Sequence, residues 1–158
     1  MTAQIRQICL SDYQSVISVI DGWWNGRHMA DMLPRLFFEH FADTSFAAER
    51  DGQLIGFLVG LLSQSRPGEA YIHFVGVHPA ERGQGLGRQL YQRFFAAAQT
   101  RGAGLVRAVT APVNYGSIRF HQQMGFGIEP GDREVNGVPV ATGYDGEGQD
   151  RVRFVKHL

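Results

Sequence analysis

The sequence has a single cysteine, Cys9, no long apolar run and no recognisable leader segment. One cysteine cannot form an internal disulfide, which fits a reducing compartment, and so small a residue is expected to be buried. No run reaches the about 20 apolar residues that span a bilayer. The N-terminus lacks a charged segment followed by an apolar one. We therefore expect a cytoplasmic protein with no membrane partner.

The sequence also lacks an excess of either charge, because 15 Lys and Arg residues balance 15 Asp and Glu residues. Without a basic excess, no global field attracts nucleic acid, and any electropositive site must be local. An apolar content of 44% in 158 residues is ordinary for a globular protein and suits one domain over residues 1–158. No internal repeat or linker divides the chain.

What the sequence does have is a cluster of glycines between a strand and a helix. Residues 71–78 form a β-rich apolar run that Pro79 closes, and residues 86–99 repeat apolar side chains at helical spacing. Between them the chain reads Arg82-Gly83-Gln84-Gly85-Leu86-Gly87-Arg88. Glycines let the backbone turn tightly and let a ligand approach bare N–H groups. Because a helix N-terminus favours anions, a phosphate is the expected ligand.

This glycine cluster is open to several interpretations. The Walker A loop needs Lys and then Ser or Thr after its last glycine, and the Rossmann fingerprint needs GxGxxG; the chain has neither. A tight turn of purely structural use remains, as does Arg82-x-x-Gly85-x-Gly87 directly after Val-x-Val-x-Pro. The second pattern resembles the pyrophosphate loop, [Q/R]-x-x-G-x-[G/A], of the GNAT superfamily of acyl-CoA-dependent N-acetyltransferases.

A second block supports the same resemblance. The stretch from Asn114 through Ser117 and His121 to Gly125-Phe126 is similar to the family helix N-x-x-[A/S]-x-x-x-[Y/F/H]-x-x-x-G-F. The resemblance implies that Asn114 and Ser117 lie at the cofactor. It also implies that His121 stands where the family usually has a Tyr, which is thought to protonate the departing thiolate. A His can donate a proton near neutral pH; alternatively, His121 only packs against the cofactor or caps a neighbour.

The order of expected elements is mixed α/β (α+β). We expect strands at 3–10, 45–50, 53–62, 71–78, 105–110, 126–128, 138–141 and 151–156, with helices at 12–22, 31–42, 86–99 and 114–124. A turn at Asp51-Gly52 marks a hairpin. The resemblance implies the GNAT fold: a central, mostly antiparallel twisted sheet of six to seven strands, splayed between the fourth and fifth strands and flanked by about four helices.

The splay implies where the cofactor binds. N–H groups of Val75, Gly76 and Val77 that lose their neighbouring strand can pair with the pantetheine and the thioester carbonyl. The diphosphate is expected on the loop, which comprises Arg82, Gly83, Gln84, Gly85, Leu86, Gly87 and Arg88.

A base is needed because an amine is mostly protonated at pH 7. His73 is our candidate, with Tyr71 and Glu69 as weaker ones; the alternative is a partly buried, hydrogen-bonded strand histidine. The period of two in a strand is expected to place one set of alternate side chains on a single face, namely Tyr71, His73, Val75 and Val77.

Together these features predict an N-acetyltransferase that uses acetyl-CoA as cosubstrate, needs no metal and transfers the acetyl group by direct attack of a primary amine. The acceptor is an amine-bearing small molecule or peptide, and the resemblance suggests a homodimer. A second hypothesis is an acyl-CoA-binding regulatory or interaction domain without turnover, since the usual Tyr is absent.

Overall fold

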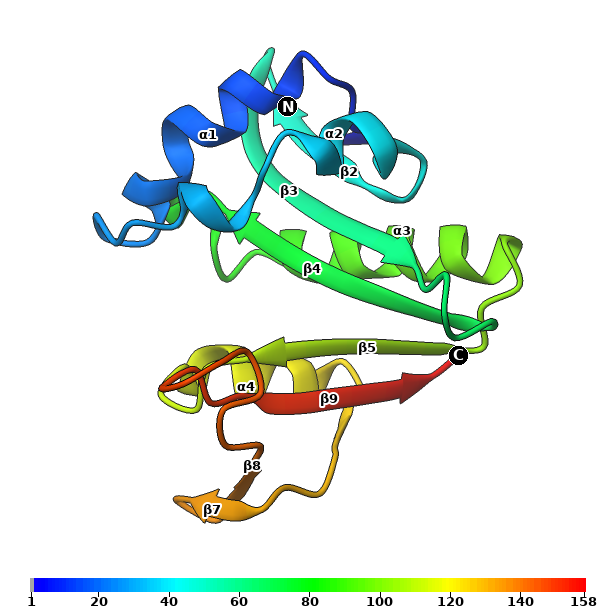
Figure 1. Cartoon of the computed structure of the whole chain (residues 1–158). Coiled ribbons are helices and arrows are strands. Elements are labelled where there is room, and N and C mark those ends of the chain that lie inside the picture. Colours follow the sequence, from blue (N-terminus) through cyan, green and yellow to red (C-terminus); the bar gives the residue numbers. More distant parts are fainter. Residues whose placement is uncertain (1) are drawn as a thin grey trace.

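The computed structural model describes residues 2–158, and its centre is a seven-stranded sheet in the order β1-β2-β3-β4-β5-β9-β6 (Figure 1). Its strands are β1 (Gln4–Gln7), β2 (Phe46–Arg50), β3 (Gln53–Leu62), β4 (Glu69–Val77), β5 (Leu105–Thr110), β6 (Gly127–Ile128) and β9 (Val152–His157). All neighbours are antiparallel except β4 and β5. A separate hairpin joins β7 (Arg133–Val135) to β8 (Val138–Val140). The expected mostly antiparallel α/β fold is confirmed.

The helices cover the two faces of the sheet unequally. Helices α3 (Leu86–Thr100) and α4 (Tyr115–Gln123) pack on one face and bury a cluster that runs from β2 to β9. Helices α1 (Asp12–Trp23) and α2 (Leu36–His40) lie over the β3 and β4 half of the other face (Figure 1). No helix among residues 2–158 is long and apolar enough to cross a membrane.

Elements with strong local signals form where the sequence predicts them. The hairpin of β2 and β3 turns at Asp51 and Gly52, whose φ angles of 53° and 77° are those of a tight, primed turn. Strand β5 has the bounds expected for it. Helix α4 begins after Asn114, whose side chain accepts a hydrogen bond from the Ser117 N–H at 3.2 Å.

The expectations for residues 31–42 and for Cys9 were wrong. Instead of one helix over 31–42, the chain forms a 3-10 turn (Ala30–Met32), α2, and a second 3-10 turn (Ala42–Thr44). Pro34 explains the break, because it disfavours helical geometry at Leu33, which adopts φ −132° and ψ 70°. Cys9 is exposed rather than buried, and its thiol lies 3.0 Å from the Ser11 hydroxyl.

A β-bulge interrupts β4 at His73. Val59 of β3 pairs with Phe74, whereas the next residue, Gly60, pairs with Ile72, so β4 contains one extra residue there. The expected single face is therefore wrong. Before the bulge Ile72 packs toward α3, which directs Tyr71 and His73 to the opposite face; after the bulge Val75 and Val77 pack toward α3.

Strands β4 and β5 separate just before the bulge. They pair only at three positions, Glu69, Ala70 and Tyr71 with Leu105, Val106 and Arg107. Beyond Tyr71 the two strands diverge (Figure 1), while β4 stays paired to β3 as far as Val77 and β5 stays paired to β9 along its length. The expected splay between the fourth and fifth strands is confirmed.

Replacing Gly76 with alanine tests the packing behind this open edge. A Cβ at Gly76 would lie 2.5 Å from Cε1 of Phe57 and 3.0 Å from Trp24. We expect Gly76→Ala to lower the free energy of unfolding in urea by about 1–3 kcal/mol through overpacking. Gly22→Ala is the control, because Gly22 lies in α1 with open space around its Cα, and alanine there should leave stability unchanged or slightly higher. Equal stability of the two variants would contradict the packing described.

Candidate active site

The loop between β4 and α3 is held by Arg82. Its guanidinium donates to the carbonyl oxygens of Val77 at 3.1 Å and Trp23 at 2.7 Å, and so ties the loop to the ends of β4 and α1. Arg82 was expected at the diphosphate, and the structure shows its guanidinium bonded to backbone oxygens. Arg88, in the first turn of α3, is exposed and makes no ion pair with any of residues 2–158. Arg88 is therefore the loop arginine with free donors.

The loop presents bare amides to solvent. Gly83 and Gly85 adopt φ angles of 79° and 86°, and an added Cβ at either position would meet open space. Among residues 2–158, the N–H groups from Gln84 to Arg88 have no acceptor, and the next amide, Gln89, donates to the Gly85 carbonyl. These donors stand at the positive end of a 15-residue helix. The arrangement suits an anion.

Leu86 and Gly87 present no side chain to this surface. Leu86 is buried in the core, so only its backbone can reach a ligand. Gly87 faces α4, where an added Cβ would lie 3.5 Å from the Phe120 ring. At Leu86 and Gly87 the loop thus offers only backbone to a ligand.

The open edge of β4 supplies two further amides. The N–H of His78 donates to the Ile55 carbonyl of β3 at 2.9 Å. Because hydrogen-bonding direction alternates along a strand, Gly76 also pairs with β3, whereas the N–H groups of Val75 and Val77 point toward the diverging β5. The Val77 carbonyl on that side is already bonded to Arg82. Free amides at Val75 and Val77 therefore line the gap.

Helix α4 packs on the same face of the sheet as α3, with its Phe120 ring beside Gly87 of the loop. The Asn114 carboxamide oxygen caps the helix, which leaves its NH₂ group toward solvent. The Ser117 hydroxyl lies 3.3 Å from Nδ1 of His121. The structure thus brings the loop, the β4 edge and the start of α4 to one side of the splay.

His121 is buried in an aromatic cluster. It is 5% exposed, and its ring stacks on Phe154 with a centroid distance of 4.2 Å. Its Nδ1–H donates to the Ser117 carbonyl at 2.8 Å, and its Nε2 accepts from the Tyr91 hydroxyl at 2.8 Å. Burial lowers the pKa of His121, so the ring is neutral near pH 7. These contacts favour the packing alternative, and the proton-donor role stays a prediction.

His73 differs from His121 in having one ring nitrogen available. Its Nε2–H donates to the Met32 carbonyl at 2.6 Å, and its ring stacks on Phe37 with centroids 4.2 Å apart. In the neutral ring, Nδ1 then keeps its lone pair. Burial lowers the pKa of His73, and the Asp145 carboxylate opposes this shift more weakly. The residue is thus neutral near pH 7 and held in the tautomer that a base requires.

Next to His73 lies a pocket that the sequence reasoning missed. It is lined by residues from five separate segments: Arg66, Tyr71, Arg107, Glu129, Tyr144 and Arg153. Arg107 and Arg153 alternate with core residues of β5 and β9, and their register places them on the face that bears Tyr71. No local motif joins these residues, so only the folded sheet reveals them. Among residues 2–158, no group of acidic, His and Cys side chains could hold a metal ion.

The sequence model of the acetyltransferase (GNAT) family matches residues 4–126. The chain belongs to this family. The match includes β4, the glycine loop, α3 and α4, which are the elements that form the open edge.

Curated members of this GNAT family show partial similarity to the chain. The L-2,4-diaminobutyric acid acetyltransferase of Nocardia farcinica is 32% identical over 83 residues, which cover 52% of this chain and 43% of that protein. The mycothiol acetyltransferase of Thermobispora bispora is 37% identical over 87 residues, covering 51% and 29%. The chain thus spans half or less of these relatives.

Solved structures of GNAT proteins share the fold across the chain. One is the diaminobutyrate acetyltransferase EctA of Paenibacillus lautus, solved in complex with its substrate L-2,4-diaminobutyric acid and coenzyme A. Its TM-score is 0.73 and its sequence identity is 20%, and the match covers 99% of this chain and 95% of the EctA chain. The same fold is thus found in a structure that holds coenzyme A.

The Tyr91–His121 pair provides a test that separates packing from proton donation. We expect His121→Phe to cost about 1–3 kcal/mol of stability, because it leaves the buried Tyr91 hydroxyl without an acceptor. The double variant His121→Phe/Tyr91→Phe should recover part of that loss, since both polar groups are gone. Urea unfolding and turnover are measured on both variants. If His121 only packs, the double variant keeps its kcat; a kcat that falls equally in both would support the proton donor.

Proposed function

We propose that the protein is an N-acetyltransferase that moves the acetyl group of acetyl-CoA to a primary amine by direct attack. The observation that carries this proposal is the open edge of β4, with the Val75 and Val77 amides free, beside the bare amides of Gln84–Arg88. Membership of the GNAT family and the names of the curated relatives support it. Because those relatives are matched only in part, the activity remains our proposal.

The cofactor is proposed to lie along the side of the splay that α3 and α4 face. The diphosphate binds the amides from Gln84 to Arg88, with the Arg88 side chain nearby, and each charge-assisted hydrogen bond contributes about 1.5–3 kcal/mol. The pantetheine runs between β4 and β5 and pairs with Val75 and Val77, near Asn114 and Ser117. This position leaves the thioester in the gap, where an amine can approach it from the face of Tyr71 and His73.

The reaction then needs one base and one oxyanion donor. The amine nitrogen attacks the thioester carbonyl carbon, a C–N bond forms, and the C–S bond breaks to release CoA thiolate. The Val75 or Val77 N–H stabilises the oxygen of the tetrahedral intermediate. Nδ1 of His73 accepts the proton that the ammonium form of the acceptor loses before it attacks, and the second proton that the nitrogen loses as the amide forms passes to solvent. A neutral imidazole is a poor acid, so we propose that the thiolate takes its proton from solvent rather than from His121.

The alternative, a CoA-binding domain without turnover, shares the cofactor site and differs only in chemistry. The pairing of both ring nitrogens of His121 is compatible with it. The available Nδ1 of His73 favours the enzyme. A homodimer, a cytoplasmic location and a single domain over residues 1–158 stay predictions.

Two glycines at opposite ends of α3 test the phosphate loop. Gly85 and Gly102 have φ angles of 86° and 88°, so alanine at either position meets the same backbone strain in open space. We expect Gly85→Ala to displace the loop amides and weaken CoA binding about ten- to a hundredfold by calorimetry. Gly102→Ala should lose similar stability but bind CoA normally. Equal CoA affinity in the two variants would contradict the loop as the phosphate site.

The pH dependence of turnover tests His73 as the base. A base must be neutral, and burial lowers the pKa of His73, so kcat/KM should be level at neutral pH and fall only below about pH 6.5. His73→Gln should lower kcat by a factor of about 10²–10⁴ and abolish the fall in kcat/KM at acidic pH, the acidic limb of the profile. His40→Gln, on the exposed side of α2, is the matched control and should behave as the parent. An unchanged acidic limb in His73→Gln would rule His73 out, and CoA binding without turnover on any amine would favour the alternative function.

A further inference from the structure

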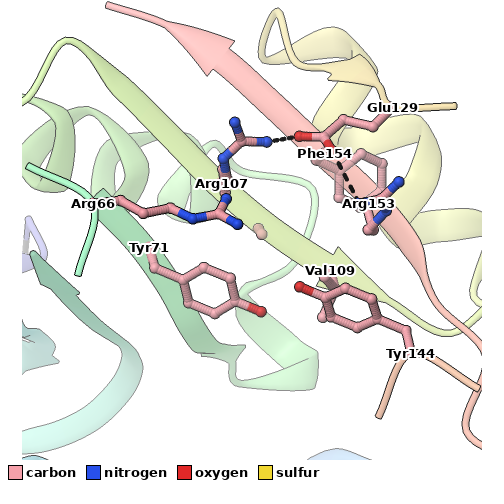
Figure 2. A pocket seen from close by; sticks show the side chains of 9 residues that line it. Arg66, Tyr71, Arg107, Val109, Glu129, Tyr144, Arg153 and Phe154 are labelled. Carbon is pink, nitrogen blue, oxygen red and sulfur yellow. Dashed lines mark ion pairs between the residues drawn. The ribbon is translucent and has the colours of Figure 1, made fainter. Parts of the chain in front are cut away.

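The pocket beside His73 is small and opens on the face of the sheet that α1 and α2 leave uncovered. Its cavity measures about 110 Å³, several times the about 30 Å³ that one water occupies in the liquid. Tyr71 of β4, Arg107 of β5 and Arg153 of β9 form its floor, and Tyr144 closes one side (Figure 2). A cavity of this size suits a small metabolite or one end of it.

Among the residues that line this cavity, positive side chains outnumber negative ones, although the Glu69 and Asp145 carboxylates lie close by. Arg66, Arg107 and Arg153 line it together with one carboxylate, Glu129, which pairs with both Arg107 and Arg153 (Figure 2). Arg107 also donates to Glu69 at 3.2 Å, so each of its three guanidinium nitrogens already contacts a carboxylate. These pairs hold Arg107 and Arg153 in place and offset part of their positive charge.

Arg66 is the arginine with donors to spare. Its side chain is 67% exposed, and its one ion pair within residues 2–158 is with Glu69 at 3.9 Å. Arg66 lies above Tyr71 in the loop before β4 and points its guanidinium into the cavity (Figure 2). A planar guanidinium in this position matches the geometry of a carboxylate.

Two phenol groups complete the polar lining. The hydroxyls of Tyr71 and Tyr144 face each other across the cavity (Figure 2), and among residues 2–158 neither has a hydrogen-bond partner. Burial raises the pKa of Tyr71 to about 12, so its hydroxyl stays protonated and can donate. The lining therefore offers a guanidinium and phenol donors to an anion.

The position of the pocket relates it to the reacting centre. Tyr71 and His73 lie on one face of β4, and His73 is the bulge residue. The Asp145 carboxylate, in the loop that carries Tyr144, acts to raise the pKa of both side chains. An acceptor anchored in the pocket would extend past His73 toward the gap between β4 and β5. The pocket that would hold the acceptor and the proposed base, His73, therefore lie along the same face of β4.

We propose that this pocket, the Arg66–Tyr71 pocket, binds the carboxylate of the acceptor, so that the acceptor is a small amine that carries a carboxylate, an amino acid. Arg66 and Tyr71 contact the carboxylate, Arg107 and Arg153 provide the positive field, and the amine lies toward His73. The inference rests on the proposed function, because it names the acceptor of that site.

The test compares amino acids with their primary carboxamides as acceptors in a thiol-release assay with acetyl-CoA. We expect the best amino acid to exceed its carboxamide by about tenfold or more in kcat/KM, through KM, since a charge-assisted hydrogen bond is lost. Arg66→Gln should remove this difference and leave the carboxamide unaffected. Arg101→Gln, exposed at the far end of α3, is the matched control and should keep the difference.

Calorimetric binding of the same amino acids to the CoA-saturated protein separates this inference from the proposed function. Turnover of carboxamides or decarboxylated amines at equal or higher kcat/KM would overturn the carboxylate pocket and leave the enzyme intact. Amino-acid binding that Arg66→Gln abolishes, without turnover of any amine, would support the pocket and overturn the enzyme. Neither binding of any amino acid nor turnover of any amine would overturn both.

Discussion

The loss of pairing between β4 and β5 after Tyr71 is the constraint on which the rest of the site depends. A sheet buries its backbone hydrogen-bonding groups by pairing every strand, and an unpaired inner edge costs free energy unless a ligand or water occupies it. Here β4 stays paired to β3 and β5 stays paired to β9, so β4 and β5 cannot close the gap without breaking those pairs. The extra residue at His73 lies just beyond the last β4–β5 pair and turns the side chains on either side of it to opposite faces.

This reversal gives the splay two chemically different sides. Toward α3 and α4 it presents free amides of β4 and of the glycine loop, which suit a phosphate and an amide-containing tail. On the other face it presents His73, Tyr71 and a cluster of arginines, which suit a small polar acceptor. Helices α1 and α2 cover only half of that face, and Phe37 and Met32 from this region hold the His73 ring. Two substrates can therefore approach one gap from opposite directions.

Much of the fold followed from local sequence signals. Asp51-Gly52 predicted the hairpin, Asn114 the start of α4, and the glycine loop the junction before α3, because each depends on a few adjacent residues. The bulge at His73 carries no such signal, since it arises from the register with β3. The same holds for the partners of His121 and for the Arg66–Tyr71 pocket, whose members come from distant segments. Pro34 does carry a local signal, because a proline disfavours helical geometry at the residue before it, here Leu33.

Amide hydrogen exchange, resolved by residue in the absence and presence of CoA, tests the central claim most directly. The account predicts that Val75 and Val77 exchange rapidly in the free protein and become protected when CoA binds, whereas Gly76, bonded to β3, is protected in both states. Slow exchange at Val75 and Val77 without ligand would mean that β4 and β5 are paired there. That result, or rapid exchange unchanged by saturating CoA, would contradict an open edge that receives the cofactor.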